Sequence, residues 1–314
     1  MNRKKVLLLA LAIFVVGNVL SVLASSFEIL ALSRAVAALG AATYTPQALG
    51  AVSLLVEPER KGRALSIVYG GMTVATALGV PFGTLLGQTF GWRFTFAGIV
   101  AIGVLTFGGL ALVLPDLAAP GVHRLRDRLS AIGNPAVLLT LSITFLAALS
   151  EHSVYSYISL ILADVRWGEN AVLPLALVFF CAGAVIGNAI SGYATDRIGS
   201  RAVLLVSIAV QSLALLALSF VYWHPLLSSA ILLVWGIAGW TYLVPIQHRL
   251  LGQSKTYGPF TVSLNSSVLY LGIGGGGALG GAFIAAFGPY QLGFLAFALG
   301  ILSLATAVFA YRAD

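Results

Sequence analysis

Gly192-Tyr193-Ala194-Thr195-Asp196-Arg197-Ile198-Gly199-Ser200-Arg201 is a short charged turn, and the apolar run Val203-Leu204-Leu205 follows it. A similar sequence stands 197 residues earlier, where Arg3-Lys4-Lys5 leads into Val6-Leu7-Leu8. The same offset relates four further pairs of identical residues: Gly79 and Gly276, Gly83 and Gly280, Phe90 and Phe287, and Gly91 and Gly288. A constant offset between matching residues is typical of an internal duplication, so we expect a two-fold repeat protein.

The composition excludes a soluble globular protein. Mean hydropathy is +1.00 and only 9% of the residues are charged, against about a quarter in soluble domains. Several apolar runs exceed the roughly 20 helical residues that cross a bilayer, and few alternate in polarity as barrel strands do. We therefore predict an all-α, polytopic helix bundle with about ten transmembrane helices. The predicted spans are 5–23, 28–55, 64–87, 93–114, 134–162, 171–194, 202–222, 225–248, 257–286 and 289–311.

The basic residues predict the orientation of these spans. Most of the 17 lysines and arginines fall in segments on one side of the membrane, and only Arg93 and Arg166 fall on the other. Arg34 lies within a span. The positive-inside rule then places both termini in the cytoplasm, with the chain in the inner or plasma membrane. Because the basic residues are shared among several short segments, a nucleic-acid partner is not expected.

The longest polar stretch, 115–133, predicts the domain boundary. Four spans precede it and six follow, which gives a bundle at 1–114, a cytoplasmic linker at 115–133 and a six-helix bundle at 134–314. The position equivalent to Asp196 in the first repeat falls just before Met1. We therefore expect the first bundle to lack two helices, roughly 60 residues with their loops.

The charged segment carries a resemblance to a known family. Gly192, Asp196, Arg197, Gly199 and Arg201 resemble the signature loop of the major facilitator superfamily, which lies between the second and third helices and again between the eighth and ninth. The resemblance implies a transporter in which this loop forms charge-assisted bonds that favour one conformational state. The alternative is that the segment only caps two helices and sets topology.

A glycine-rich span adds to the resemblance. Gly79, Pro81, Gly83 and Gly87 resemble the glycine–proline motif of the fifth helix that is associated with antiporters of this superfamily. Glycines four residues apart allow close helix packing, and proline bends a helix. The alternative is ordinary packing of small residues.

Two ionisable groups lie within predicted spans, where such groups are functional candidates. Arg34, six residues before Gly40, resembles the fourth-helix pattern Arg-x-x-x-x-x-Gly; it is expected to transfer protons or pair with a carboxylate, or else to reach the headgroups. Glu151, followed by His152 and sharing a helix face with Tyr155, is a candidate for proton or substrate binding. The alternative for Glu151 is a helix broken at 150–153, with the carboxyl nearer the surface.

Further polar and aromatic residues in the spans are candidates to line a substrate cavity, although each alone is more often an interhelical hydrogen bond. They are Tyr44, Gln47, Trp240, Gln247 and Asn265. The histidines are scattered and there is one cysteine, so no catalytic site, metal site or cofactor is expected.

Among the subfamilies, the chain most resembles the bacterial drug:proton antiporters of the arabinose-efflux-permease type. The resembling stretches are 79–87, 155–157 and 264–272. The resemblance implies proton-coupled efflux of a small amphipathic compound, with drug resistance as one outcome, by a monomer in the lipid bilayer. The alternatives are a sugar or metabolite transporter of the same fold and a truncated membrane protein that transports nothing.

Overall fold

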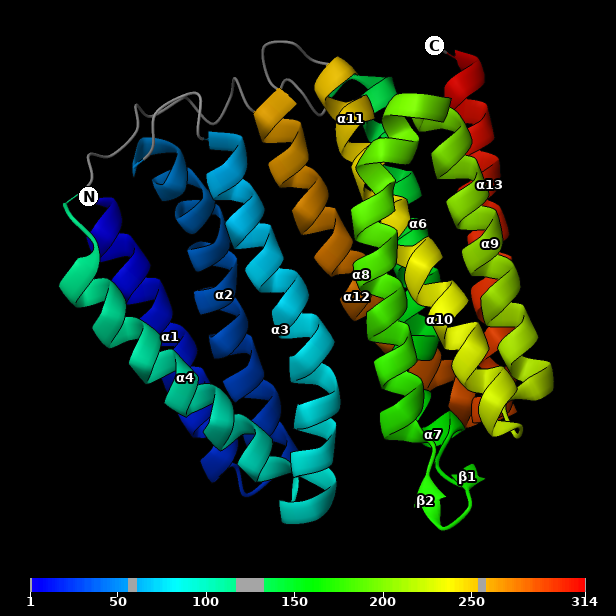
Figure 1. Cartoon of the computed structure of the whole chain (residues 1–314), viewed down its shortest axis with the longest axis horizontal. Coiled ribbons are helices and arrows are strands. Elements are labelled where there is room, and N and C mark those ends of the chain that lie inside the picture. The colour runs from blue at the N-terminus through cyan, green and yellow to red at the C-terminus, as the bar shows by residue number, and fades with distance from the viewer. Residues whose placement is uncertain (1, 56–60, 117–132, 254–257, 314) are drawn as a thin grey trace. The chain divides into compact units, whose positions relative to one another are not determined.

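The computed structural model describes residues 2–55, 61–116, 133–253 and 258–313 (Figure 1). Most of the predicted linker, 117–132, lies outside the described residues. The internal contacts divide the chain into two units, Met1–Val122 and His123–Asp314, and each is described here by itself.

The described residues of the first unit form four long helices. They are α1 (Arg3–Leu23), α2 (Phe27–Leu55), α3 (Lys61–Phe90) and α4 (Trp92–Val113). The Asn2 side chain caps α1 by accepting a hydrogen bond of 2.9 Å from the Lys4 amide. Helix α1 packs against α2 and α4, and α3 contacts both α2 and α4. Gly17 and Gly40 allow the close packing of α1 on α2, because a Cβ at either would clash with the backbone of the other helix.

The second unit is a helix bundle with one small hairpin. Its elements are α6 (Pro135–Tyr155), α7 (Ile158–Ile161), β1 (Arg166–Trp167), β2 (Asn170–Ala171), α8 (Leu173–Ile198), α9 (Ser200–Val221), α10 (Pro225–Thr241), α11 (Leu243–Gln253), α12 (Gly258–Phe287), η3 (Pro289–Gln291) and α13 (Leu292–Ala313). The strands pair antiparallel. Helix α6 lies at the centre of the packing, in contact with α9, α11, α12 and α13, while α8 packs against α10.

The helix boundaries follow the 197-residue offset seen in the sequence. Helix α12 begins and ends at positions shifted by that offset from the ends of α3, and α9 begins at the position equivalent to the start of α1. Gly91 and Gly288, also an equivalent pair, have positive φ values of 92° and 82°. In the second unit, α9 packs against α10 and α13, and α12 against α11 and α13, as their equivalents do in the first. The duplication is thus visible in the arrangement of helices within each unit.

The predicted spans correspond to these helices. Nine helical segments among the described residues are long and apolar enough to cross a membrane. The remaining predicted span is α3, whose 30 residues would extend about 45 Å. Side chains in the first part of α3 lie outside the described residues.

Two details of the predicted spans were wrong. The charged segment 192–201 is not a turn: α8 continues to Ile198, and Gly199 alone, with φ +87°, separates it from α9. The span predicted at 134–162 is α6 followed by a separate short helix, α7. The span predicted at 225–248 corresponds to one apolar segment, Pro225–Gln253, within which α10 gives way to α11 at Tyr242.

The break between α10 and α11 has a local cause. Pro245 has no amide hydrogen to donate to the carbonyl of Thr241, four residues earlier. That carbonyl instead accepts a hydrogen bond of 2.6 Å from the hydroxyl of Ser191 on α8. A buried serine on a neighbouring helix therefore satisfies the group that the proline leaves without a helical partner.

Candidate functional site

Glu151 lies in the core of the second unit. It is on the penultimate turn of α6 and only 7% of its surface is exposed. Helix α6 is continuous through positions 150–153, so the alternative of a broken helix with a surface carboxyl was wrong. The helix ends only after Tyr155, where the chain turns into α7.

Four other side chains surround this carboxyl. They are Tyr155 on α6, Gln211 on α9, Trp235 on α10 and Tyr242 at the α10–α11 junction, and together with Glu151 we call them the Glu151 cluster. Gln211, Trp235 and Tyr242 are 2%, 0% and 1% exposed. Tyr155 and Tyr242 interact electrostatically with Glu151, and the Trp235 indole lies beside its carboxyl.

Gly239 leaves room for the polar ends of the cluster. A Cβ at this position would lie 3.2 Å from Oε1 of Glu151 and 3.5 Å from Oε1 of Gln211. The two side-chain oxygens, from α6 and α9, therefore border the same small space beside α10. A larger residue at position 239 would occupy the space that separates them.

Aromatic rings form one wall of the cluster. The Tyr155 ring lies 5.0 Å from Phe180 and 6.0 Å from Trp235, and Phe180 lies 5.1 Å from Trp235. Tilted and edge-on arrangements at these distances are favourable for aromatic pairs. The carboxyl is thus set against apolar rings, away from bulk water.

His152 is bound to its own helix. Its Nδ1 lies 3.1 Å from the Ala148 carbonyl oxygen, and its ring meets that of Tyr155 edge-on at 5.8 Å. His152 thus contacts the Tyr155 ring, and Tyr155 lies beside Glu151.

The remaining cavity candidates lie on α2, α10, α11 and α12. Asn265 on α12 accepts a hydrogen bond of 2.6 Å from Thr144 on α6. This is an interhelical hydrogen bond, the alternative to a place in the substrate cavity. Trp240 and Gln247 are half-buried on α10 and α11. In the first unit Tyr44 packs on a small apolar cluster around Leu7, and Gln47 is half-buried on the same helix, α2.

Arg34 has a neutral partner. Its guanidinium donates a hydrogen bond of 3.0 Å to Oδ1 of Asn18 on α1 and lies 5.1 Å from the centre of the Phe96 ring on α4. Asn18 is fully buried. Among the described residues, Arg34 therefore has an amide as its hydrogen-bond acceptor rather than a carboxylate.

The charged motif lies at the end of α8 and the start of α9. Gly192 is on α8, and Asp196 is exposed on its last turn. Arg197 donates a hydrogen bond to the Tyr193 hydroxyl, and Arg201 lies 5.8 Å from the Tyr311 ring.

The glycine–proline motif faces α4 within the first unit. Helix α3 runs through Pro81 without interruption. The Thr95 hydroxyl of α4 donates a hydrogen bond of 3.0 Å to the Gly83 carbonyl, and a Cβ at Gly87 would lie 3.2 Å from that hydroxyl. Nothing described lies within 4 Å of a Cβ placed at Gly79. Its repeat equivalent packs more tightly, since a Cβ at Gly276 would lie 2.7 Å from the Leu149 carbonyl oxygen of α6.

Comparison with known proteins identifies the family. Residues 1–255 match the sequence profile of the Major Facilitator Superfamily. The chain belongs to the major facilitator superfamily. It is 30% identical to the "Uncharacterized MFS-type transporter YtbD" of Bacillus subtilis (strain 168) over 89% of this chain and 71% of that protein. It is 29% identical to the "Inner membrane transport protein YdhP" of Escherichia coli (strain K12) over 90% of this chain and 73% of that protein.

Two further comparisons bear on substrate and fold. A "Probable sugar efflux transporter" of Mannheimia succiniciproducens is 27% identical over 97% of this chain and 76% of that protein. The crystal structure of a bacterial homologue of the human lysosomal transporter Spinster, inward-facing and unoccupied, aligns with a TM-score of 0.72 at 19% identity. The alignment covers 99% of this chain and 83% of that one and shows the shared fold. The protein is therefore a multi-pass membrane protein of a transporter family that acts on small molecules, and not an enzyme.

Sequence reasoning missed several buried groups of this transporter. Gln211 and Trp235 belong to the Glu151 cluster, and the only signal for Gln211 was an amide inside the apolar run 202–222. Arg249 was counted only toward topology, yet it is 7% exposed. It donates hydrogen bonds of 3.0 Å to Thr140 on α6 and to the Ala310 carbonyl on α13, so it links three helices at one end of the unit.

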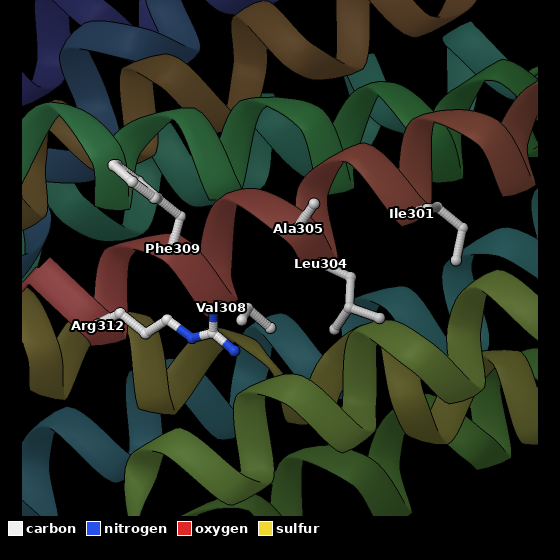
Figure 2. A pocket seen from close by; sticks show the side chains of 6 residues that line it. All are labelled: Ile301, Leu304, Ala305, Val308, Phe309 and Arg312. Carbon is white, nitrogen blue, oxygen red and sulfur yellow. The ribbon is translucent and has the colours of Figure 1, made fainter.

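A shallow hollow of about 370 Å³ lies on the surface of α13 (Figure 2). It is lined by Ile301, Leu304, Ala305, Val308, Phe309 and Arg312, all from that one helix. An apolar helix face with a cation at its end is what a lipid-facing surface presents. We therefore do not assign the transported substrate to it.

Proposed function

We propose that this chain is a proton-coupled secondary transporter that exports a small amphipathic compound, with Glu151 as the proton-carrying group. One observation carries the proposal: a glutamate that is 7% exposed lies beside aromatic rings in the core of the second unit. An ionised carboxylate there loses its hydration and is costly, whereas the protonated form is neutral. Proton release would then require a conformation that opens the cluster to water, which is how protonation becomes coupled to alternating access.

The other predicted groups take parts in the same cycle. We propose that the bundles at 1–114 and 134–314, joined through 115–133, rock relative to one another around a substrate site. In this proposal the motif of Gly192, Asp196, Arg197, Gly199 and Arg201 favours one state, and Gly79, Pro81, Gly83 and Gly87 permit helix movement. Tyr44, Gln47, Trp240, Gln247 and Asn265 remain candidates for substrate contact, with His152 and Tyr155 beside the proton site.

The location is proposed from charge and from relatives. The positive-inside rule favours both termini in the cytoplasm. The relative YdhP is named an inner membrane transport protein, which supports the bacterial inner membrane as the site of action. We propose that the transporter acts as a monomer in the bilayer.

Sugar export is the second candidate function. The relative named a "Probable sugar efflux transporter" matches over 97% of this chain, which favours a sugar or similar polyol as substrate. Protonation of Glu151 would drive the cycle in either case, so the proton test does not depend on the substrate.

The test uses the chain reconstituted in proteoliposomes. Ethidium serves as an amphipathic probe and radiolabelled arabinose as a sugar probe, and transport is measured with and without an imposed pH gradient. The Glu151→Gln variant should lose gradient-driven transport by at least about tenfold while retaining gradient-independent exchange, because the amide cannot release a proton. The matched control is Glu28→Gln, which changes an acid that is exposed on α2. Gradient-driven transport by Glu151→Gln at the wild-type rate would rule out the proton role.

A further inference from the structure

Two buried polar atoms beside Glu151 have no hydrogen-bond partner in the part of the chain that the structure describes. One is Oε1 of Gln211, an acceptor, and the other is Nε1–H of Trp235, a donor. Both side chains are almost completely buried, at 2% and 0% exposure. Buried polar groups are nearly always bonded, so a pair of unmatched ones at the same place requires an explanation.

Both atoms lie next to the carboxyl. Oε1 of Gln211 and Oε1 of Glu151 border the same space beside Gly239. The Trp235 indole interacts with the Glu151 carboxyl, although it lacks the geometry of a hydrogen bond. The acceptor comes from α9 and the donor from α10, so the carboxyl of α6 is approached from two helices.

The two protonation states of a carboxyl need different partners. A protonated carboxyl has an O–H group that donates, whereas an ionised one only accepts. We infer that Gln211 and Trp235 are positioning residues that serve one state each: the Gln211 oxygen accepts from protonated Glu151, and the Trp235 N–H donates to ionised Glu151. This inference rests on the proton-carrying role proposed for Glu151. Neither atom is bonded in the described structure. In the proposed cycle each protonation state bonds one of them, so that the Glu151 carboxyl changes its partner from α9 to α10 when it releases its proton.

Other titratable and charged groups are few around this pair. Tyr155 and Tyr242 face Glu151, Cys181 on α8 lies near Tyr155, and His152 is bound to the Ala148 carbonyl. Helices α10 and α12 carry no charged residue, and those of α8, α9 and α13 lie at helix ends. Arg249 of α11 bonds to Thr140, eleven residues before Glu151 and so roughly 16 Å away along α6.

The test follows the protonation of Glu151 directly. Infrared difference spectra of the reconstituted protein report the C=O stretch of a protonated carboxyl as pH is varied, and Glu151→Gln identifies the band that belongs to Glu151. Gln211→Met removes the acceptor with little change of shape and should move the midpoint of that band to lower pH. Trp235→Phe removes the donor and should move it to higher pH. Each shift should be about 0.5–1 pH unit, as expected for one hydrogen bond.

Two variants control for general effects on packing. Ser207→Ala changes a buried hydroxyl one turn away on α9 that bonds only to the carbonyl of Val203, and Trp223→Phe changes an exposed indole. Neither should move the midpoint. If Gln211→Met does not fold, Gln211→Leu supplies the same loss of acceptor.

The outcomes separate the two proposals. Midpoints that do not move, or that move in the same direction for Gln211→Met and Trp235→Phe, would overturn the division of roles and leave the proton role of Glu151 intact. A shift of both midpoints to higher pH would mean that the Gln211 amide presents its N–H to the carboxylate instead. A wild-type spectrum with no band that Glu151→Gln abolishes would overturn the proton role itself.

Discussion

Arg34 on α2 donates a hydrogen bond of 3.0 Å to Asn18 on α1. The acceptor is an amide that is itself fixed, because Nδ2 of Asn18 donates to the Phe14 carbonyl at 2.8 Å. The Phe96 ring of α4 lies on the guanidinium as well, 5.1 Å away. One arginine thus connects three helices of the first unit.

This contact predicts a coupling between the two side chains. Asn18→Leu and Arg34→Met should each lower the free energy of unfolding by about 1 kcal/mol, since each removes one partner of the bond. The double variant should cost less than the sum of the two. Thermal unfolding of the purified protein in detergent measures the cycle, with Thr43→Ala, an exposed hydroxyl on α2, as the control. Simple additivity would show that the bond contributes nothing.

The glycines of α12 predict a position-specific effect. A Cβ at Gly276 would clash with the backbone of α6, whereas no atom of the described residues lies within 4 Å of one at Gly274. Gly276→Ala should therefore destabilise the protein by about 1–3 kcal/mol through overpacking. Gly274→Ala, two residues away on the same helix, should be neutral or stabilising by up to about 1 kcal/mol. Equal unfolding temperatures for the two variants would contradict the observed packing of α12 on α6.

The buried arginine of α11 predicts a large loss of stability. Arg249 bonds to Thr140 and to the Ala310 carbonyl, and its guanidinium lies 4.0 Å from the centre of the Tyr311 ring. Arg249→Leu leaves these groups without their donor and should cost about 3 kcal/mol. Arg249→Lys should cost less than Arg249→Leu, because the lysine ammonium keeps the charge and can still donate some of the hydrogen bonds made by the guanidinium. Arg312→Leu, at an exposed arginine of α13, should change the unfolding temperature little. If Arg249→Leu unfolds at the same temperature as Arg312→Leu, the contact of Arg249 with three helices does not stabilise the protein.

Asp196 predicts an effect on transport without an effect on folding. It is exposed on the last turn of α8, where the helix dipole disfavours a negative charge. Asp196→Asn should therefore fold as well as the wild type, or be more stable by about 0.3–1 kcal/mol.

Transport by the same variant should fall several-fold, because we expect the carboxylate to find its partner in another state of the cycle. Membrane insertion, scored by surface labelling of the outer loops, should not change. Asp164→Asn, an exposed acid after α7, is the matched control. Wild-type transport by Asp196→Asn would leave the motif as a topology signal only.

The sequence by itself determined the class of fold, the limits of most spans, the repeat and the family. These features depend on local composition: apolar runs of bilayer length must form helices, and the 197-residue offset appears again in the ends of α3 and α12. Glu151 could be singled out for a similar reason, since an acid in the middle of an apolar run stands out without knowledge of its neighbours.

Only the tertiary structure decided which side chains meet. Glu151, Gln211 and Trp235 are separated by tens of residues, and nothing in their local sequence indicates that α6, α9 and α10 bring them together. The break at Tyr242 and the burial of Arg249 likewise depend on Ser191, Thr140 and Ala310, which belong to other helices. Helix packing depends on long-range shape complementarity, and periodicity within one span specifies a helix without specifying the residues that it contacts.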